Sequence, residues 1–324
     1  MLAQVKANDS GLSLCEVKYR IKKTLRNGMD RLDDILTYRH PDVTAEFLKD
    51  KGVKGRDLGL LYLKEITKAF SSIPYENITK IIAAAEGDGI SRLRLPEVLY
   101  SDHIRFGTGG TCFSMTYFLV SILCDLGFSA YPVLADRPLV PNSHAACIVL
   151  IGGRRYLIDP AFMIDEPLLI SEERSVYHLA HNSFLIGRKR DVEIDGAQLE
   201  YLRGFRGSCI PYWEREEGCY VVATLRPRLK VRYLFSCEPA NDFKFLSCWL
   251  DSFDWPGMKN ISIARPLKDG YMYIRGDLLR IEGGFGRRQE RIKDDWVSVI
   301  RSVIGLDRRL VERCLEITRR RRYA

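Results

Sequence analysis

One of the nine cysteines, Cys112, lies in a sequence context that favours nucleophilic chemistry. It follows the run Gly-Thr-Gly-Gly-Thr and begins an apolar segment, Cys112 to Leu126, which stops at Gly127 and predicts a buried helix with a glycine cap. Helix N-terminal N–H groups favour a thiolate and can also stabilise an oxyanion that forms when sulfur attacks a carbonyl. A single cysteine of this kind is more often a small buried hydrophobe, so a second feature is needed.

A histidine and an aspartate supply that second feature. The segment from His144 to Asp159 predicts a β-hairpin with a two-residue turn at Gly152-Gly153. If Ile151 pairs with Arg154, His144 and Asp159 become diagonal neighbours on one face, with Cα atoms about 7–8 Å apart. A carboxylate that orients an imidazole is what a cysteine–histidine pair requires, whereas a slip of one residue separates the two side chains onto opposite faces.

Metal chemistry has weaker support. His178 and His181 are three residues apart on a possible helix, but no third ligand is in evident reach. The cysteines include no C-x-x-C pair, and the glycine run at 283–286 does not match G-x-G-x-x-G. We therefore expect a solvated histidine pair, an ordinary turn at the glycines, and no metal site.

The elements that position these residues change character along the chain. The first hundred residues predict helices, one capped by Thr44 and a second that begins at Leu58 and ends at Pro74. The second helix has one apolar stripe, which consists of Leu58, Leu61, Tyr62, Ile66, Ala69 and Phe70. Residues 105–215 are rich in short β-like runs. Beyond them we expect four more strands, followed by a helix that begins near Asp294; the predicted strands are Cys219–Leu225, Val231–Phe235, Tyr271–Arg275 and Leu278–Ile281.

Composition limits the class of protein. The chain has 324 residues, 46% hydrophobic and 28% charged, which predicts about two globular folding units and excludes a mostly disordered protein. The net charge of +8 includes a block at Arg319–Arg322, for which we expect a solvated, frayed tail. The sequence lacks the stripe of aromatic and basic residues that is typical of nucleic-acid binding. No apolar stretch suits a membrane span, and unpaired cysteines without a signal-peptide layout predict a cytoplasmic protein.

Three short motifs in this order resemble the arylamine N-acetyltransferases. The chain has G-G-T-C-F at 109–113, a histidine that begins a strand at 144, and Y-L-I-D at 156–159. The family pattern is R-G-G-x-C-[FY]-E, H-x-x-L-x-V and W-L-V-D, and Ile73-Pro-Tyr-Glu-Asn77 is similar to its I-P-F-E-N segment. The resemblance runs from about Thr44 to Phe162 and continues more loosely around Ala264 to Gly276.

The resemblance implies an α+β fold. Its expected parts are an N-terminal extension over residues 1–43, a helical bundle over 44–104, a catalytic core with the nucleophile helix and a β-barrel-like domain over 105–215, and a C-terminal α/β lid with a basic tail over 216–324.

The resemblance also implies ping-pong acyl transfer from an acyl-CoA, or a carrier thioester, to a small-molecule amine, with no bound cofactor. Cys112 is then the nucleophile, His144 the base and Asp159 the orienting acid. The N–H of Phe113 serves the oxyanion hole, and Gly109, Gly110 and Glu76 support the site.

Departures from the family pattern leave alternatives open. The arginine before G-G is replaced by Thr108, although its partner Glu76 is kept, and Arg105 is a candidate substitute. Ser114 replaces the acidic residue after the nucleophile, and Asp159-Pro-Ala-Phe162 is closer to transglutaminase-like thiol enzymes. The acceptor is an arylamine or an amine of a natural-product intermediate. The alternatives are a transglutaminase-like hydrolase or protease, and an inactive relative that acts as a binding protein.

Overall fold

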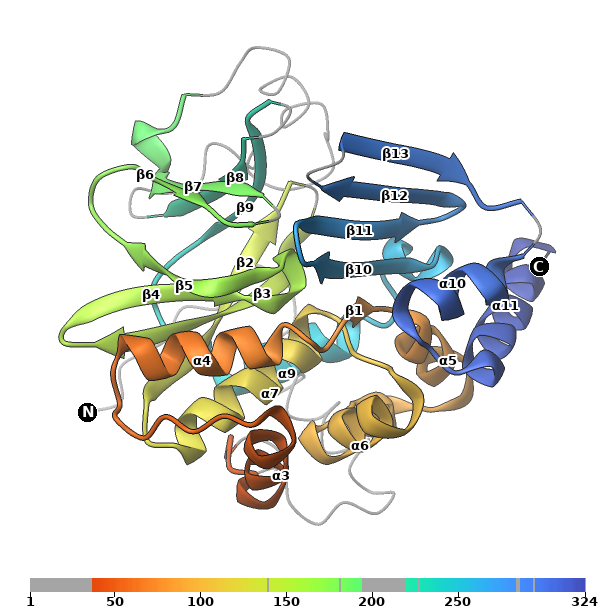
Figure 1. Cartoon of the computed structure of the whole chain (residues 1–324), viewed down its shortest axis with the longest axis horizontal. Coiled ribbons are helices and arrows are strands. Elements are labelled where there is room, and N and C mark those ends of the chain that lie inside the picture. Colours follow the sequence, from red (N-terminus) through yellow and green to blue (C-terminus); the bar gives the residue numbers. More distant parts are fainter. Residues whose placement is uncertain are drawn as a thin grey trace, which may run out of the picture.

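The computed structural model describes residues 37–138, 140–180, 182–193, 219–225, 228–283, 286–293 and 295–323. Helices from the first part of the chain pack beside a nearly closed, barrel-like sheet, and a second sheet lies next to the last two helices (Figure 1). The predicted α+β class is confirmed. No helix within the described ranges has the length and apolar character needed to cross a membrane.

The N-terminal helices surround the helix that begins at the candidate nucleophile. These elements are α3 (Pro41–Lys51), α4 (Leu60–Phe70), the short strand β1 (Tyr75–Glu76), α5 (Ile78–Glu86), the 3-10 turn η1 (Gly89–Arg92), α6 (Pro96–Phe106) and α7 (Cys112–Asp125). Helix α7 is buried continuously from Cys112 to Leu123, as its apolar sequence predicts. Aromatic rings from α3, α4 and α6 pack on Phe118 of α7, so the bundle fixes the direction of this helix.

Two predictions for this bundle were wrong in detail. Helix α3 begins at Pro41 rather than at Thr44, because proline suits a first helical turn and Asp125 of α7 accepts the His40 N–H at 3.0 Å. Thr44 lies inside the helix, where its hydroxyl donates to Asp125 at 2.7 Å. In α4 the predicted stripe is confirmed at Tyr62, Ile66 and Phe70, which are buried, but Leu61 is 85% exposed and the fully buried Leu63 was not in the stripe.

The barrel-like sheet has eight strands in the order β5-β4-β3-β2-β9-β8-β7-β6. Their bounds are β2 (Ser129–Arg137), β3 (Val140–Ile151), β4 (Arg154–Asp159), β5 (Ile164–Ile170), β6 (Ser175–His178), β7 (Ser183–Arg188), β8 (Tyr220–Thr224) and β9 (Lys230–Phe235), with 3-10 turns η2 (Pro160–Phe162) and η3 (Lys189–Asp191). Strands β3 and β4 pair with Ile151 opposite Arg154, which confirms the predicted hairpin register. Gly152 and Gly153 both have positive φ, as this turn requires.

Strands β8 and β9 belong to this sheet and not to the C-terminal part. Strand β9 pairs with β2 through Ala135 and Phe235, and β8 pairs with β7. The expected boundary between residues 215 and 216 therefore falls within the sheet. Alternate residues of the two strands, Tyr220 and Val222 of β8 and Tyr233 and Phe235 of β9, pack in one core cluster with residues of β2–β5 and β7, although they come later in the chain.

The C-terminal part consists of a five-stranded sheet, α9 and two final helices. The sheet has the order β1-β10-β11-β12-β13, so β1 of the helical bundle forms one of its edges. The elements are α9 (Asp242–Asp251), the 3-10 turn η5 (Pro256–Lys259), β10 (Ser262–Leu267), β11 (Gly270–Arg275), β12 (Leu278–Gly283), β13 (Gly286–Arg291), α10 (Trp296–Ile304) and α11 (Arg308–Tyr323). The arginine block is helical rather than frayed, because the apolar side chains of Val311, Cys314 and Ile317 pack in one core with α5.

Candidate active site

The loop before Cys112 is held against the segment that contains β1. Gly110 N–H donates to the Pro74 carbonyl at 3.3 Å, and Glu76 N–H donates to the Gly110 carbonyl at 3.0 Å. A Cβ atom on Gly109 would lie only 1.7 Å from the Pro74 carbonyl oxygen, so this close approach requires glycine. The glycines that the sequence singled out thus bring the nucleophile loop and the bundle together.

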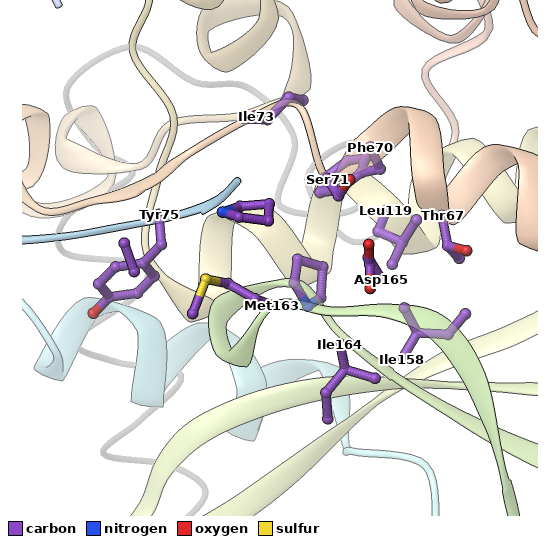
Figure 2. Close-up of a pocket in the computed structure, with 13 residues that line it drawn as sticks. Thr67, Phe70, Ser71, Ile73, Tyr75, Leu119, Ile158, Met163, Ile164 and Asp165 are labelled. Carbon is purple, nitrogen blue, oxygen red and sulfur yellow. The ribbon is translucent and has the colours of Figure 1, made fainter. Parts of the chain in front are cut away.

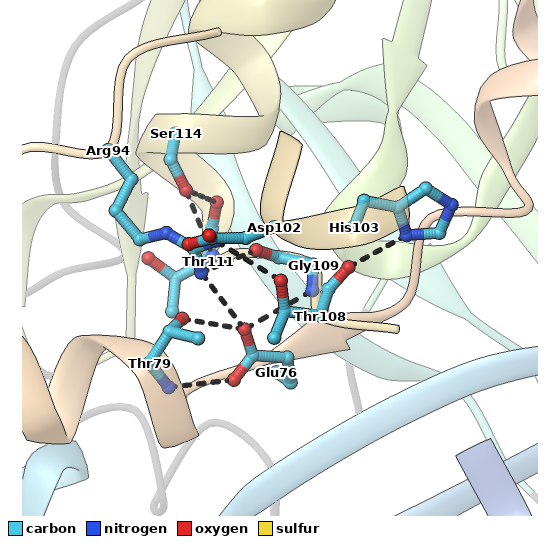
Figure 3. A network of polar contacts seen from close by, with 9 residues as sticks. All are labelled: Glu76, Thr79, Arg94, Asp102, His103, Thr108, Gly109, Thr111 and Ser114. Carbon is cyan, nitrogen blue, oxygen red and sulfur yellow. Dashed lines mark hydrogen bonds and ion pairs between the residues drawn. The ribbon is translucent and has the colours of Figure 1, made fainter. Parts of the chain in front are cut away.

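A buried polar network fixes the same loop (Figure 3). The Glu76 carboxylate is fully buried and accepts hydrogen bonds from the N–H and hydroxyl of Thr79 and from Gly109 N–H. Arg94 lies 3.4 Å from Glu76 and donates to the Gly109 carbonyl at 3.0 Å. The second guanidinium nitrogen of Arg94 reaches Asp102 at 2.9 Å.

Arg94 therefore takes the place that the sequence assigned to Arg105. Arg105 lies in the last turn of α6 and is exposed, whereas Arg94 is 8% exposed and points to the carboxylate. Arg94 is distant from the G-G pair in sequence and follows a 3-10 turn, so no motif marks it. The one available signal was an arginine between two leucines, Leu93 and Leu95, two residues before Pro96.

Cys112, His144 and Asp159 meet at the start of α7. Nε2 of His144 lies 2.7 Å from Oδ2 of Asp159, and both side chains are almost wholly buried. The other carboxylate oxygen of Asp159 accepts the N–H groups of Ala161 and Phe162, which fixes the rotamer of the acid. The Cys112 thiol forms a hydrogen bond with the His144 imidazole. The three residues that the sequence brought forward are thus adjacent in space.

Aromatic side chains enclose the imidazole. The ring centroids of Tyr233 and Phe162 lie 4.7 and 5.0 Å from that of His144. Phe162 comes from the turn after Asp159, and Tyr233 comes from β9. Sequence reasoning did not identify Tyr233, because its strand was assigned to another part of the chain. This enclosure keeps water from the acid–imidazole pair and strengthens their electrostatic interaction.

The charges of the triad favour a thiolate–imidazolium pair. Burial lowers the pKa of His144, but the Asp159 carboxylate and the Cys112 thiolate outweigh burial and raise it to about 9. Burial raises the pKa of the Cys112 thiol, while hydrogen bonding to His144 and the positive charges of His144, Lys80 and Arg137 bring it below its ordinary value. A thiol with a lowered pKa beside a protonated imidazole is an activated nucleophile at neutral pH.

The first turn of α7 leaves N–H groups available beside the thiol. A capping box joins Thr111 and Ser114, and Met115 N–H donates to the Thr111 carbonyl at 3.0 Å. The N–H groups of Cys112 and Phe113 have no acceptor among the residues that the structure describes. They therefore remain at the positive end of the helix, in the place where an oxyanion next to Sγ can be stabilised.

An apolar cavity lies close to the triad but not within it (Figure 2). It has about 330 Å³ of empty space, and Tyr75, Ile158 and Met163 are among the side chains that line it. Because neighbouring strand residues point to opposite faces, Ile158 faces this cavity while Asp159 faces His144. None of Cys112, His144 and Asp159 lines this cavity.

The other sequence candidates lie apart from the triad. His178 lies on β6 and not on a helix, and its ring contacts the Ser183 hydroxyl at 2.9 Å, while His181 lies outside the described residues. Gly283 pairs with Gly286 at a hairpin end. In the described part of the chain no group of three or more His, Cys, Asp or Glu residues is arranged to hold a metal ion.

Solved structures place this fold in a known class. An arylamine N-acetyltransferase from Mycobacterium abscessus superposes with a TM-score of 0.70 at 15% identity, covering 90% of this chain and 99% of that one. The Mycobacterium marinum arylamine N-acetyltransferase in complex with CoA has a TM-score of 0.64 at 17% identity, covering 85% and 99%. An arylamine N-acetyltransferase from Bacillus cereus, with a unique Cys-His-Glu catalytic triad, has a TM-score of 0.62 at 18% identity, covering 82% and 99%. The fold is that of the arylamine N-acetyltransferases.

Family membership follows from the sequence profile. The profile of the N-acetyltransferase family matches residues 60–310, which is most of the chain. No curated protein sequence gives a significant match. The chain belongs to the arylamine N-acetyltransferase family, as the motifs around Cys112 indicated.

Proposed function

We propose that this protein is a cysteine-dependent N-acyltransferase that moves an acyl group from a thioester to an amine through an acyl-Cys112 intermediate. The observation that carries the proposal is that one buried imidazole, that of His144, contacts both the Cys112 thiol and the Asp159 carboxylate at the N-terminus of α7. The family membership supports the class of reaction, and this geometry supports the roles that we assign to the three residues.

In the first half-reaction the Cys112 thiolate attacks the acyl carbonyl carbon. The N–H of Phe113, with that of Cys112, stabilises the oxyanion. The bond between the acyl carbon and the donor sulfur then breaks, and the His144 imidazolium gives its proton to the departing thiolate. Asp159 holds the Nε2 proton throughout, so the other ring nitrogen carries out the transfer.

In the second half-reaction an amine attacks the acyl-cysteine. Neutral His144 takes the proton from the attacking nitrogen, the amide forms, and Cys112 leaves as the thiolate. The imidazolium and thiolate are thereby restored together, and the raised pKa of His144 supports this resting state.

A basic cluster supports an acyl-CoA as the donor. Positive side chains of four strands, β2, β9, β11 and β12, are close enough to repel one another electrostatically. They are Arg137, Lys230, Arg232, Arg275 and Arg280. Burial lowers the pKa of Arg232, and the charges of Arg137 and Arg280 lower it further. Arg137 also acts on the Cys112 thiol, so the cluster extends to the nucleophile. Phosphate groups are the ligands that such a cluster favours.

Intact mass spectrometry tests the proposal. The protein is incubated with several acyl-CoA thioesters, beside a Cys112→Ala variant of equal thermal stability. We expect a mass gain of one acyl group on the wild type only, and its loss on addition of an aromatic amine with formation of the amide. An adduct on the variant, or amide formation by it, refutes the assignment of Cys112. Hydrolysis of a peptide or amide without any CoA dependence favours the thiol hydrolase alternative.

A further inference from the structure

A second group of positive side chains lies beside the loop that precedes Cys112. These side chains come from α5, from η1 and from the segment after η1. Lys80 of α5, Arg92 of η1 and Arg94 line a cleft of about 230 Å³. The remaining wall includes Gly110 and Thr111 of the nucleophile loop. Figure 3 shows Arg94 beside Thr111 and Ser114, over the start of α7. The cleft therefore adjoins the residues that immediately precede Cys112.

Lys80 is a buried cation whose nearby negative charge, in the described part of the chain, is the Cys112 thiolate rather than a carboxylate. It is 6% exposed, and its ammonium donates to the Ser252 hydroxyl and lies 4.8 Å from the centre of the Phe253 ring. No carboxylate in the described ranges pairs with it or acts on its charge. Burial lowers its pKa to about 8, while the Cys112 thiolate acts in the opposite direction. An ammonium kept in such a position normally has an anionic partner.

Arg94 provides a second unfilled donor in the same cleft. Its two terminal nitrogens are occupied by Glu76, Gly109, Asp102 and Thr108, but its Nε–H is buried and has no partner among the described residues. Arg92 uses its own Nε for the Gly87 carbonyl, and its guanidinium lies near the Phe253 ring. The cleft thus has three positive side chains, those of Lys80, Arg92 and Arg94. The two nearby acids, Glu76 and Asp102, are both bound to Arg94.

We propose that Lys80, Arg92 and Arg94 form a subsite for an anionic group, a carboxylate or a phosphate, on the substrate that reacts at Cys112. This inference rests on the proposed function, because it takes Cys112 as the reacting residue. It goes beyond that function by assigning a negative charge to the acceptor or to the acyl chain.

Two alkylating agents of similar size test the subsite. Iodoacetate carries a carboxylate and iodoacetamide is neutral, and both label a reactive cysteine. We expect the ratio of their rates at Cys112 to favour iodoacetate in the wild type and to fall by about tenfold in Lys80→Met, because one desolvated charge pair is lost. Arg92→Met should lower the ratio in the same direction. The exposed Lys49 of α3 gives the matched control, and Lys49→Met should keep the wild-type ratio.

The outcomes separate three explanations. The subsite is supported if the ratio of the iodoacetate rate to the iodoacetamide rate falls in Lys80→Met and stays at the wild-type value in Lys49→Met. Equal slowing of both reagents in Lys80→Met overturns it, because Lys80 then acts only as the counter-ion of the thiolate. If neither reagent labels Cys112, the proposed nucleophile fails, and the subsite is decided by ligand binding instead.

Ligand binding is measured by thermal unfolding with benzoate and with benzamide as probes. We expect benzoate to raise the melting temperature of the wild type and of Cys112→Ala, and not that of Lys80→Met, while benzamide raises none of them. Equal effects of benzoate on all three proteins, or no effect on any, overturn the subsite. This readout does not depend on the reactivity of Cys112.

Matched substrates identify which reactant carries the charge. One pair compares an aromatic amine that bears a carboxylate with its carboxamide, and the other compares succinyl-CoA with butyryl-CoA. In one of the two pairs, the wild type should prefer the charged member and Lys80→Met should not. That pair identifies the reactant that carries the negative charge. Inorganic phosphate as competitor distinguishes a phosphate-bearing substrate, and a lack of preference in every case overturns the proposal.

Discussion

Replacing Asp159 by asparagine should change the tautomer of His144 while the fold is kept. The asparagine carbonyl can still accept the N–H groups of Ala161 and Phe162, now 3.1 and 3.2 Å from Asp159 Oδ1. Its amide NH₂ then faces Nε2 of His144 at the position of Oδ2, which forces Nε2 to become an acceptor. The ring proton moves to the nitrogen that faces Cys112, and the imidazole can no longer take the thiol proton.

The size of the effect follows from the charge that is removed. Asp159 and Cys112 together raise the pKa of His144 from 6.5 to about 9, against the effect of burial. A shift of this size corresponds to about 3 kcal/mol. Without the carboxylate, burial alone acts on the ring, so the ion pair at pH 7 should become less populated by a factor on the order of 100 or more.

The assay is the rate of alkylation of Cys112 by iodoacetamide between pH 5 and 10, read by intact mass. The wild type should show a plateau below pH 9, where thiolate and imidazolium coexist. Asp159→Asn should react about 100-fold more slowly at pH 7 and approach the wild-type rate only at alkaline pH. Asp165 is a matched control, since it is a buried carboxylate on β5 that pairs with Lys68 and not with His144. An Asp159→Asn profile that matches the wild type would refute the reasoning.

Three other substitutions test the surroundings of the site. Arg94→Met should lower the free energy of unfolding, measured in urea, by about 3–5 kcal/mol, because Glu76 is left with an unpaired buried charge. Arg105 is exposed, so Arg105→Met should change this free energy by less than about 0.5 kcal/mol. Similar values for the two variants contradict the conclusion that Arg94 is the partner of Glu76. Gly109→Ala should abolish Cys112 labelling or the fold, because the added Cβ collides with the Pro74 carbonyl. The Cβ of Gly257→Ala meets nothing within 4 Å, so this control variant should be tolerated. Equal rates of Cys112 labelling in the two variants contradict the prediction. Lys80→Met should be more stable than the wild type at pH 7 by roughly 1–3 kcal/mol, since the folded protein must keep a buried ammonium charged. The unfolded chain binds more protons between pH 8 and 10.5, so wild-type stability rises through this window and the advantage of the variant should shrink; a constant difference in urea titrations across these pH values opposes the interpretation.

The β3–β4 hairpin could be predicted because its information is local. The Gly152-Gly153 turn sets the pairing of β3 with β4, and the two-residue period then places His144 and Asp159 on one face. Helix α7 was predictable for a similar reason, since its apolar run begins at the capping box and stops before Gly127. In both cases a few adjacent residues determine the geometry.

The supporting residues could not be predicted because they come from distant parts of the chain. Arg94 reaches Glu76 across 18 residues and Gly109 across 15, and no sequence period links the three. Tyr233 packs on His144 only because β9 crosses to pair with β2. Lys80 gave no signal, since a lysine four residues after Glu76 fits an exposed helix position as well as a buried one.

The position of Arg94 explains how the motif can change while the loop geometry is kept. The family arginine precedes the glycine pair, and here that position is Thr108, whose hydroxyl instead accepts a hydrogen bond from Arg94 at 3.2 Å. The guanidinium therefore approaches Glu76 from the segment after η1, and it still donates to the Gly109 carbonyl. Arg94 also lines the cleft with Lys80, and its buried Nε has no partner among the described residues. The same substitution that preserves the nucleophile thus leaves a donor free for a ligand, which is why the anion subsite and the altered motif belong to one structural change.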